Sequence, residues 1–290
     1  MKVRKHKVLD HPILGYALLC IFVMLVSEIF STFIDQMILA PLIPGYGTVV
    51  EMYGQKVMSA SGAGTAIGAV VCVIIFWLWF RPAFDGMLKG KDLLKGLLLL
   101  LPFLVFHWAG SVVSLIQLGT ASVFIAFLRA LAPGFMEEIA FRGLGVANYM
   151  RTKNNEKGVM KIFWISSIVF GFIHMTNVLA GAPLLTSLIQ SVYAAGVGMA
   201  FAAVYLKTGN LWPTIIGHAS VDFLEFIRAD LGASGGVMGG MGLGDWITIA
   251  AGVFAAVWAL YLMRKSCRQQ IVDLWNGKWK TEVAQEPAAQ

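Results

Sequence analysis

The stretch APGFMEEIAFRG, residues 132–143, places two adjacent glutamates and an arginine inside an otherwise apolar run. Its surroundings are equally apolar: 58% of the 290 residues are hydrophobic and 13% are charged, whereas a soluble domain carries about 25% charged residues. Runs of about 20 apolar residues, the length that crosses a bilayer as a helix, recur along the chain. The sequence therefore predicts an all-α polytopic membrane protein.

The apolar runs and the polar segments between them predict about eight transmembrane helices. They cover residues 13–33, 62–80, 93–115, 121–149, 162–180, 184–206, 211–227 and 246–263. In this interpretation residues 1–12 are a cytoplasmic N-terminal segment and residues 13–263 form the membrane domain. Residues 264–290 are predicted to form a short, polar and partly disordered cytoplasmic tail.

The positions of the basic residues predict the orientation of these helices. Of the 22 Lys and Arg residues, 18 lie before the first span or after the second, fourth, sixth and eighth, and only Lys56 and Arg228 lie in the alternate connections. By the positive-inside rule, both termini are expected in the cytoplasm, with the protein crossing the cell membrane several times. The net charge of +6 is spread over separate segments, so it indicates topology, with the lipid bilayer and not a nucleic acid as partner.

Ionisable side chains from three predicted spans reach a common depth. Such residues cost a few kcal/mol inside a membrane and usually mark function. With a rise of 1.5 Å per residue, Glu137 lies about 18 Å from the cytoplasmic end of its span. His174 lies about 18 Å, His218 about 11 Å and Asp222 about 17 Å from the cytoplasmic ends of theirs. The coincidence predicts one assembled site near the middle of the membrane.

Helical spacing gives the two glutamates different roles. Glu138 and Arg142 are four residues apart and lie on one helix face, where they can pair, whereas Glu137 points about 100° away. We therefore predict that the pair is structural and that Glu137 faces a cavity. Pro133 removes a helical hydrogen-bond donor, so the helix is expected to kink or open just before the glutamates.

The two histidines supply chemistry that complements the acids. A neutral imidazole can orient water, accept a proton, donate to an oxyanion or bind a metal. Because no serine or cysteine stands in a setting typical of a nucleophile, imidazoles and carboxylates around a pocket predict a water-activating hydrolase. If the site holds a metal, zinc fits its donors, and the ligands would be Glu137, His174, His218 and Asp222. The HExxH spacing of many zinc peptidases is absent from the sequence.

Three motifs, in this order, resemble the signatures of a known family. EEIAFR (137–142), FGFIH (170–174) and HASVD (218–222) are similar to the EExxxR, FxxxH and HxxxN/D motifs of type II CAAX prenyl endopeptidases. This is the CPBP or abortive-infection family, which also includes bacteriocin-processing and immunity proteins. The resemblance covers about residues 120–230, the expected catalytic core. It implies an eight-helix intramembrane protease fold that encloses a cavity open to the cytoplasm.

The resemblance also implies roles for the site residues. Glu137 and His174 would activate the attacking water, His218 and Asp222 would stabilise the oxyanion, and the structural pair after Glu137 would support them. Asp222 departs from the prenyl-processing members, which have asparagine there, and an ionised aspartate cannot donate to an oxyanion. Either Asp222 is protonated, or it orients His218, or the site holds a cation.

Three classes of function follow from these patterns. The first is an intramembrane peptidase that cuts a cytoplasm-accessible or membrane-anchored peptide or protein, and prenyl-CAAX ends, bacteriocin leaders and regulatory membrane proteins all stay open as its substrates. The second is a non-catalytic immunity or scaffold protein of the same family, which keeps the site as a packing network. The third is a transporter with a proton relay, which predicts broken helices in two related halves, whereas a Pro-Gly break occurs here in one predicted span.

Overall fold

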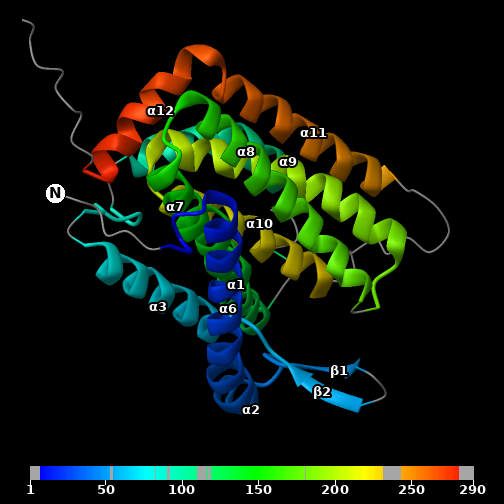
Figure 1. The fold of residues 1–290 in the computed structure, drawn as a ribbon. Coiled ribbons are helices and arrows are strands. Elements are labelled where there is room, and N and C mark those ends of the chain that lie inside the picture. Colours follow the sequence, from blue (N-terminus) through cyan, green and yellow to red (C-terminus); the bar gives the residue numbers. More distant parts are fainter. Residues whose placement is uncertain are drawn as a thin grey trace, which may run out of the picture.

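A computed structural model describes residues 7–52, 55–81, 83–89, 92–109, 116, 119–179, 181–230 and 243–280. Over these residues the chain is a bundle of helices with one small β-hairpin at its side (Figure 1). The predicted all-α membrane class is confirmed, and each of the eight predicted spans contains a helix.

The elements follow one another along the chain with short connections. In order they are α1 (Pro12–Phe30), the π-helix η1 (Ser31–Leu39), α2 (Ala40–Leu42), β1 (Thr48–Met52), β2 (Gln55–Ser59), α3 (Ala63–Phe80), α4 (Leu93–Ala109), α6 (Thr120–Glu137), the π-helix η2 (Glu138–Leu144), α7 (Gly145–Thr152), α8 (Glu156–Ile173), the 3-10 helix η3 (His174–Val178), α9 (Leu184–Thr208), α10 (Trp212–Asp230), α11 (Leu243–Leu262) and α12 (Lys265–Lys278). The two strands pair in antiparallel register, with Thr48 opposite Ser59.

The number of membrane spans differs from the predicted eight. By length and apolarity, four described helical stretches can cross a membrane: Pro12–Leu42, Ala63–Phe80, Glu156–Val178 and Leu184–Thr208. The bent pair of α11 and α12 would make a fifth. Eight spans are therefore not confirmed, although each of the eight segments contains a helix in its described part. One reason is that α6, η2 and α10 carry the charged residues of the candidate site, which lowers their apolarity.

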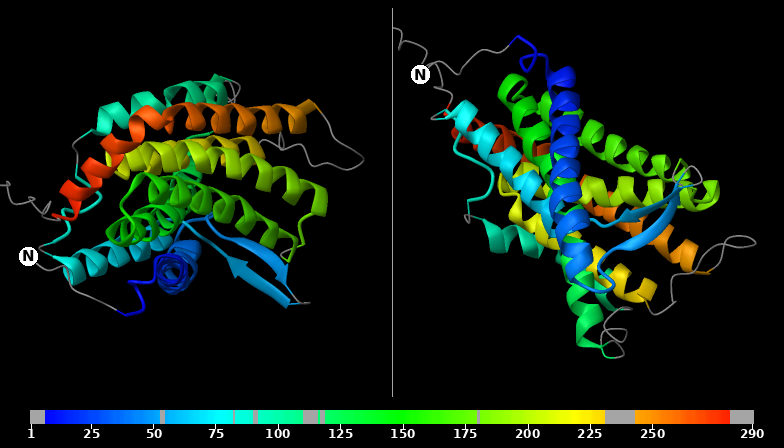
Figure 2. Two further views of the ribbon diagram at one scale, coloured as in Figure 1. Left: turned by 45° about the horizontal axis from the view of Figure 1, so that its top comes forward. Right: turned by 90° about the horizontal axis from the view of Figure 1, so that it is seen from below.

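The core of the bundle is built around α9, against which α8 and α11 pack on either side. Figure 2 (left) shows α11, α9 and α8 stacked beside one another. Small residues permit this closeness: a Cβ added at Gly196 in α9 would lie 2.0 Å from the carbonyl oxygen of Gly252 in α11. Such small-residue contacts are the usual means by which membrane helices approach each other. Elsewhere in the bundle α1 packs on α3, and α6 packs on α10.

Part of the tail that was predicted to be partly disordered is folded: Lys265–Lys278 form the helix α12, which is bent by 75° from α11. Two tryptophans four residues apart, Trp275 and Trp279, give it an apolar face and are fully buried. Their indole N–H groups donate to the carbonyl oxygens of Leu206 and Ala147, at 3.0 Å each. Trp279 also stacks on Phe84, with ring centroids 4.3 Å apart. Burial of these large rings outweighs the polarity of the segment.

The first helix extends beyond its predicted end at residue 33, through η1 and α2 to Leu42. The extension brings the buried Asp35 against the start of α3. Its Oδ1 accepts hydrogen bonds from the Tyr46 hydroxyl (2.7 Å) and the Gly64 N–H (2.8 Å). Its Oδ2 accepts from the N–H groups of Gly62 and Thr65, at 3.0 Å each, and from the Thr65 hydroxyl at 3.1 Å. Asp35 therefore caps a helix that is not its own.

Candidate active site

The two glutamates of the opening stretch stand where one kind of helix changes into another. Glu137 is the last residue of α6, and Glu138 is the first residue of the π-helix η2. A π-helical segment of this kind is rare and often occurs at functional sites. The two side chains consequently differ in environment: that of Glu138 is 0% exposed and that of Glu137 is 18% exposed.

The helix does not open before the glutamates, as the proline predicts, but from Glu138 onward. Pro133 stays inside the regular helix α6. The reason is tertiary packing on α10: a Cβ added at Gly134 would lie 2.7 Å from the Cβ of Ala219, so the two helices touch directly after the proline. This contact holds α6 helical through a position at which an isolated helix would be weakened.

The predicted pair of Glu138 and Arg142 forms, with Arg142 Nη1 donating to Glu138 Oε1 at 2.9 Å, and both side chains are fully buried. The guanidinium also lies over the ring of Phe170, 3.8 Å from its centroid, and 5.8 Å from that of Phe201. Gly198 in α9 makes room for it, because a Cβ there would lie 2.8 Å from Arg142 Nη2. Neither Phe201 nor Gly198 was singled out by sequence reasoning, since neither carries a group that reacts.

His218 joins the acids of the site from α10. Its Nδ1 lies 2.9 Å from Glu138 Oε1, and its Nε2 lies 3.3 Å from Asp222 Oδ2 and 3.9 Å from Glu137 Oε2. The imidazole therefore touches two of the three carboxylates and comes near the third. Its ring packs between Phe170 and Phe201, with centroid distances of 5.7 Å and 5.5 Å, which fixes its plane.

His174 reaches the same cluster less directly. It is the first residue of η3, directly after α8, and its ring meets that of Phe170 edge-on at 5.3 Å. Phe170 thus touches His174, His218 and Arg142 at once. Direct polar contacts join four of the six predicted site residues: Glu138, Arg142, His218 and Asp222. Glu137 comes within 3.9 Å of His218, and among the described residues His174 reaches the cluster through the ring of Phe170.

The arrangement does not fit a zinc ion. Zinc binds His and carboxylate ligands at about 2.0–2.2 Å in a tetrahedral set, and within the described residues no group of three or more His, Cys, Asp or Glu side chains could hold a metal. His218 directs one ring nitrogen to Glu138 and the other to Asp222. The expected ligand set of Glu137, His174, His218 and Asp222 is therefore not assembled here as a metal site.

Comparison with known protein families agrees with the motifs. Residues 119–224 match the model of a family described as type II CAAX prenyl endopeptidase Rce1-like. This part of the chain is similar to an Rce1-like domain. The domain contains all six candidate site residues, and its limits agree with the core of about 120–230 expected from the sequence. No curated protein and no solved structure matches the chain.

Proposed function

We propose that this protein is an intramembrane endopeptidase that hydrolyses a peptide bond with a water molecule activated by Glu137 and His174. One observation supports this most: within an Rce1-like domain, the half-buried Glu137 stands beside the imidazole of His218, and that imidazole is itself tied to Asp222 and Glu138. A base next to a buried hydrogen-bond donor is what attack on a carbonyl requires.

In the proposed reaction, Glu137 accepts a proton from a water shared with His174, and the resulting hydroxide adds to the scissile carbonyl carbon. The oxyanion that forms accepts a hydrogen bond from Nε2–H of His218, which gives up its contact with Asp222 at this step, while Nδ1 stays on Glu138. As the carbon–nitrogen bond breaks, the proton on Glu137 passes to the leaving nitrogen, which gives a carboxylic acid and an amine. Of the roles open to Asp222, orientation of His218 is favoured by its contact with Nε2 at 3.3 Å.

The substrate that we propose is a peptide or protein segment held in or at the bilayer, with a prenyl group as one form of anchor. Purified protein in lipid nanodiscs would be assayed against peptides that carry a farnesyl group, a hydrocarbon anchor or no anchor. General-base assistance contributes about 10²–10⁴-fold to rate, so Glu137→Gln should lose at least 10²-fold in kcat. Glu28→Gln is the matched control, because Glu28 is exposed on α1.

Wild-type protein and Glu137→Gln with the same activity would contradict the peptidase proposal. If the wild type and Glu137→Gln both lack activity on every peptide class but bind a protein partner equally, the protein has the non-catalytic immunity or scaffold role instead. The control variant separates loss of chemistry from a general effect of removing a carboxylate.

We also propose that both termini are cytoplasmic, which rests on the distribution of basic residues. The three native cysteines are buried, so introduced cysteines can be labelled selectively. On intact cells, a membrane-impermeant thiol reagent should label Ser234→Cys and not Lys153→Cys. Labelling of both positions, or only of Lys153→Cys, would contradict this orientation.

A further inference from the structure

A histidine and a tyrosine that belong to none of the three motifs form a polar contact between α4 and α9. His107 Nε2 lies 2.8 Å from the hydroxyl oxygen of Tyr193. The two rings meet edge-on, with centroids 5.4 Å apart, and both side chains are half-buried. We call these two residues the Tyr193–His107 pair.

The pair lies beside the turn of α10 that carries His218 and Asp222. Trp108, the residue after His107, donates its indole N–H to the hydroxyl of Ser220 at 3.3 Å. Ser220 stands midway between His218 and Asp222 in the sequence. The end of α4 that carries the pair is therefore fastened to α10 within the candidate active site.

A row of aromatic rings also joins the pair to His218. The ring of His107 contacts that of Phe103, with centroids 4.7 Å apart. Phe103 contacts Phe201 at 6.1 Å, and Phe201 contacts His218 at 5.5 Å. Tilted and edge-to-face contacts of this kind give each ring a preferred orientation. The position of the pair is therefore coupled to that of the imidazole in the site.

The hydroxyl of Tyr193 is placed to serve a carboxylate of α10. The acid whose charge acts most strongly on this hydroxyl is Asp222, followed by Glu225. Glu225 is exposed, whereas the Asp222 side chain is 26% exposed and lies against His218. A tyrosine has a single O–H donor. If Nε2–H of His107 donates to the tyrosine oxygen, that O–H remains for a carboxylate.

We propose that Tyr193 is a positioning residue whose O–H binds the carboxylate of Asp222 when Nε2–H of His218 leaves it for the oxyanion. Before this step, Asp222 Oδ2 lies 3.3 Å from His218 Nε2. Loss of that partner would leave a poorly solvated carboxylate, which is costly. A short rotation of the Asp222 side chain toward α9 replaces the partner with a charge-assisted hydrogen bond. The inference rests on the proposed peptidase function and adds to it a residue outside the motifs.

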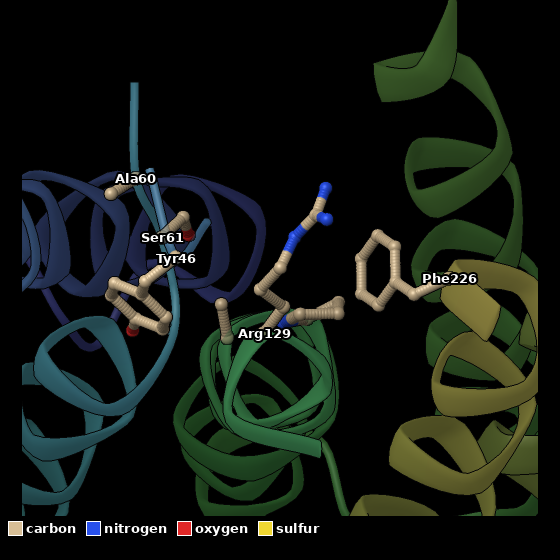
Figure 3. Close-up of a pocket in the computed structure, with 7 residues that line it drawn as sticks. Tyr46, Ala60, Ser61, Arg129 and Phe226 are labelled. Carbon is tan, nitrogen blue, oxygen red and sulfur yellow. The ribbon is translucent and has the colours of Figure 1, made fainter. Parts of the chain in front are cut away.

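A second hydrogen-bond donor, Arg129, approaches the same stretch of α10 from α6. Figure 3 shows its side chain beside the Phe226 ring, at a cavity of about 230 Å³. The guanidinium lies over this ring, 4.6 Å from the centroid, and Phe226 follows Asp222 by one helical turn. Because Tyr193 comes from α9 and Arg129 from α6, substitution of each one in turn shows which donor serves Asp222.

Cleavage kinetics of single and double variants in nanodiscs test the inference. Tyr193→Phe should lower kcat by about 10- to 100-fold with KM unchanged, because a hydrogen bond to a charged group is lost after substrate has bound. In an Asp222→Asn background the same substitution should cost less than about threefold, because a neutral amide needs the donor less. Tyr149→Phe, at a buried tyrosine of α7, is the matched control and should change kcat in neither background.

A structural role of the pair predicts a different pattern. Hydrogen bonds between membrane helices also hold the helices together, and loss of such a bond would lower the thermal midpoint and cost the same kcat in both backgrounds. Equal losses in the two backgrounds, no loss in either, or an Asp222→Asn protein without measurable cleavage would overturn the inference. A loss in Arg129→Gln that disappears in the Asp222→Asn background would assign the carboxylate to Arg129 and overturn it as well.

The role of His107 is tested by a variant that keeps its donor. The side-chain N–H of glutamine in His107→Gln can still donate to the Tyr193 hydroxyl, so kcat should stay within about threefold of wild type, whereas His107→Phe should lose about as much as Tyr193→Phe. Equal losses in the two variants would overturn the role of His107. Cleavage without coupling between Tyr193 and Asp222 would overturn the inference alone, whereas absence of cleavage of every peptide class would overturn the peptidase function and the inference with it.

Discussion

Two π-helical segments of this protein, η1 and η2, each hold a buried acid, and the two carboxylates differ in how their oxygens are hydrogen-bonded. Asp35 in η1 accepts hydrogen bonds on both oxygens, three of them from backbone N–H groups around the start of α3. Glu138 in η2 accepts from Arg142 and faces His218 through Oε1. Its Oε2, like Oε2 of Glu137, is buried without a hydrogen-bond partner among the described residues.

This difference separates an acid whose two oxygens are both used by the fold from acids that keep one oxygen without a hydrogen bond at the candidate site. The positive end of α3 and its free N–H groups stabilise a carboxylate at the position of Asp35. Every acceptor there is used, so the residue can do little else. Glu137 and Glu138 each retain an oxygen without a hydrogen bond, and Glu137, whose side chain is 18% exposed, is the one that lies nearer to solvent. Asp35 and Glu138 are equally buried, and they differ in whether both carboxylate oxygens accept hydrogen bonds.

The largest effect is expected for Glu138→Gln. The substitution strands the charge of Arg142 in a site with no exposure, and breaking a buried pair in this way costs about 3–5 kcal/mol. It also removes the carboxylate that faces His218 Nδ1 at 2.9 Å. We expect lower abundance, a lower thermal midpoint in detergent and loss of peptide cleavage together. Unchanged stability and activity would show that the pair is not structural, and Glu225→Gln, an exposed acid on α10, is the control.

A smaller and different effect is expected for Asp35→Asn. The amide group of asparagine turns an N–H donor toward backbone donors on one side, which leaves buried groups unsatisfied at a cost of about 1–3 kcal/mol. We predict a lower free energy of unfolding with kcat per folded molecule preserved, measured by thermal unfolding and cleavage on the same preparation. Asp273→Asn, at an exposed acid of α12, should change neither quantity. Loss of kcat without loss of stability would mean that the contrast between the two π-helices is wrong.

Sequence reasoning could find Glu137 and Glu138 because charge in an apolar run is conspicuous and helical rise gives its depth. That same calculation brought His218 and Asp222 to the level of Glu137, and the structure places His218 Nε2 within 3.9 Å of Glu137 Oε2. Sequence reasoning could not find Asp35. The first span was predicted to end at residue 33, whereas the helical stretch continues to Leu42. The donors to Asp35 are mostly backbone groups, which leave no mark in the sequence.

Other features depended on contacts between distant segments. The π-helix η2 carries no local signal, and the proline predicted the opening one turn too early because the packing of Gly134 on Ala219 is invisible in a single sequence. The folding of α12 depends on contacts of its two buried tryptophans with distant parts of the chain, at Leu206 and Ala147. The role of Phe170 as the common neighbour of His174, His218 and Arg142 likewise needs the three-dimensional arrangement.

The smallest effect is expected for Asp222→Asn, and it bears on whether the acids of the site need a metal. Asparagine can still accept a hydrogen bond from His218 Nε2 through its amide oxygen, and its N–H₂ group can donate to an oxyanion. We therefore expect kcat/KM to change by less than about tenfold, which corresponds to about 1.4 kcal/mol in the barrier. Asp222→Ala, which removes both functions, should be more severe. Because the donor atoms do not form a zinc site, a chelator should leave wild type and Asp222→Asn equally active, and added zinc should not stimulate either. A chelator-sensitive wild type that zinc restores, together with a loss above about 10²-fold in Asp222→Asn, would identify Asp222 as a ligand and replace the water-activation mechanism with a metal-dependent one.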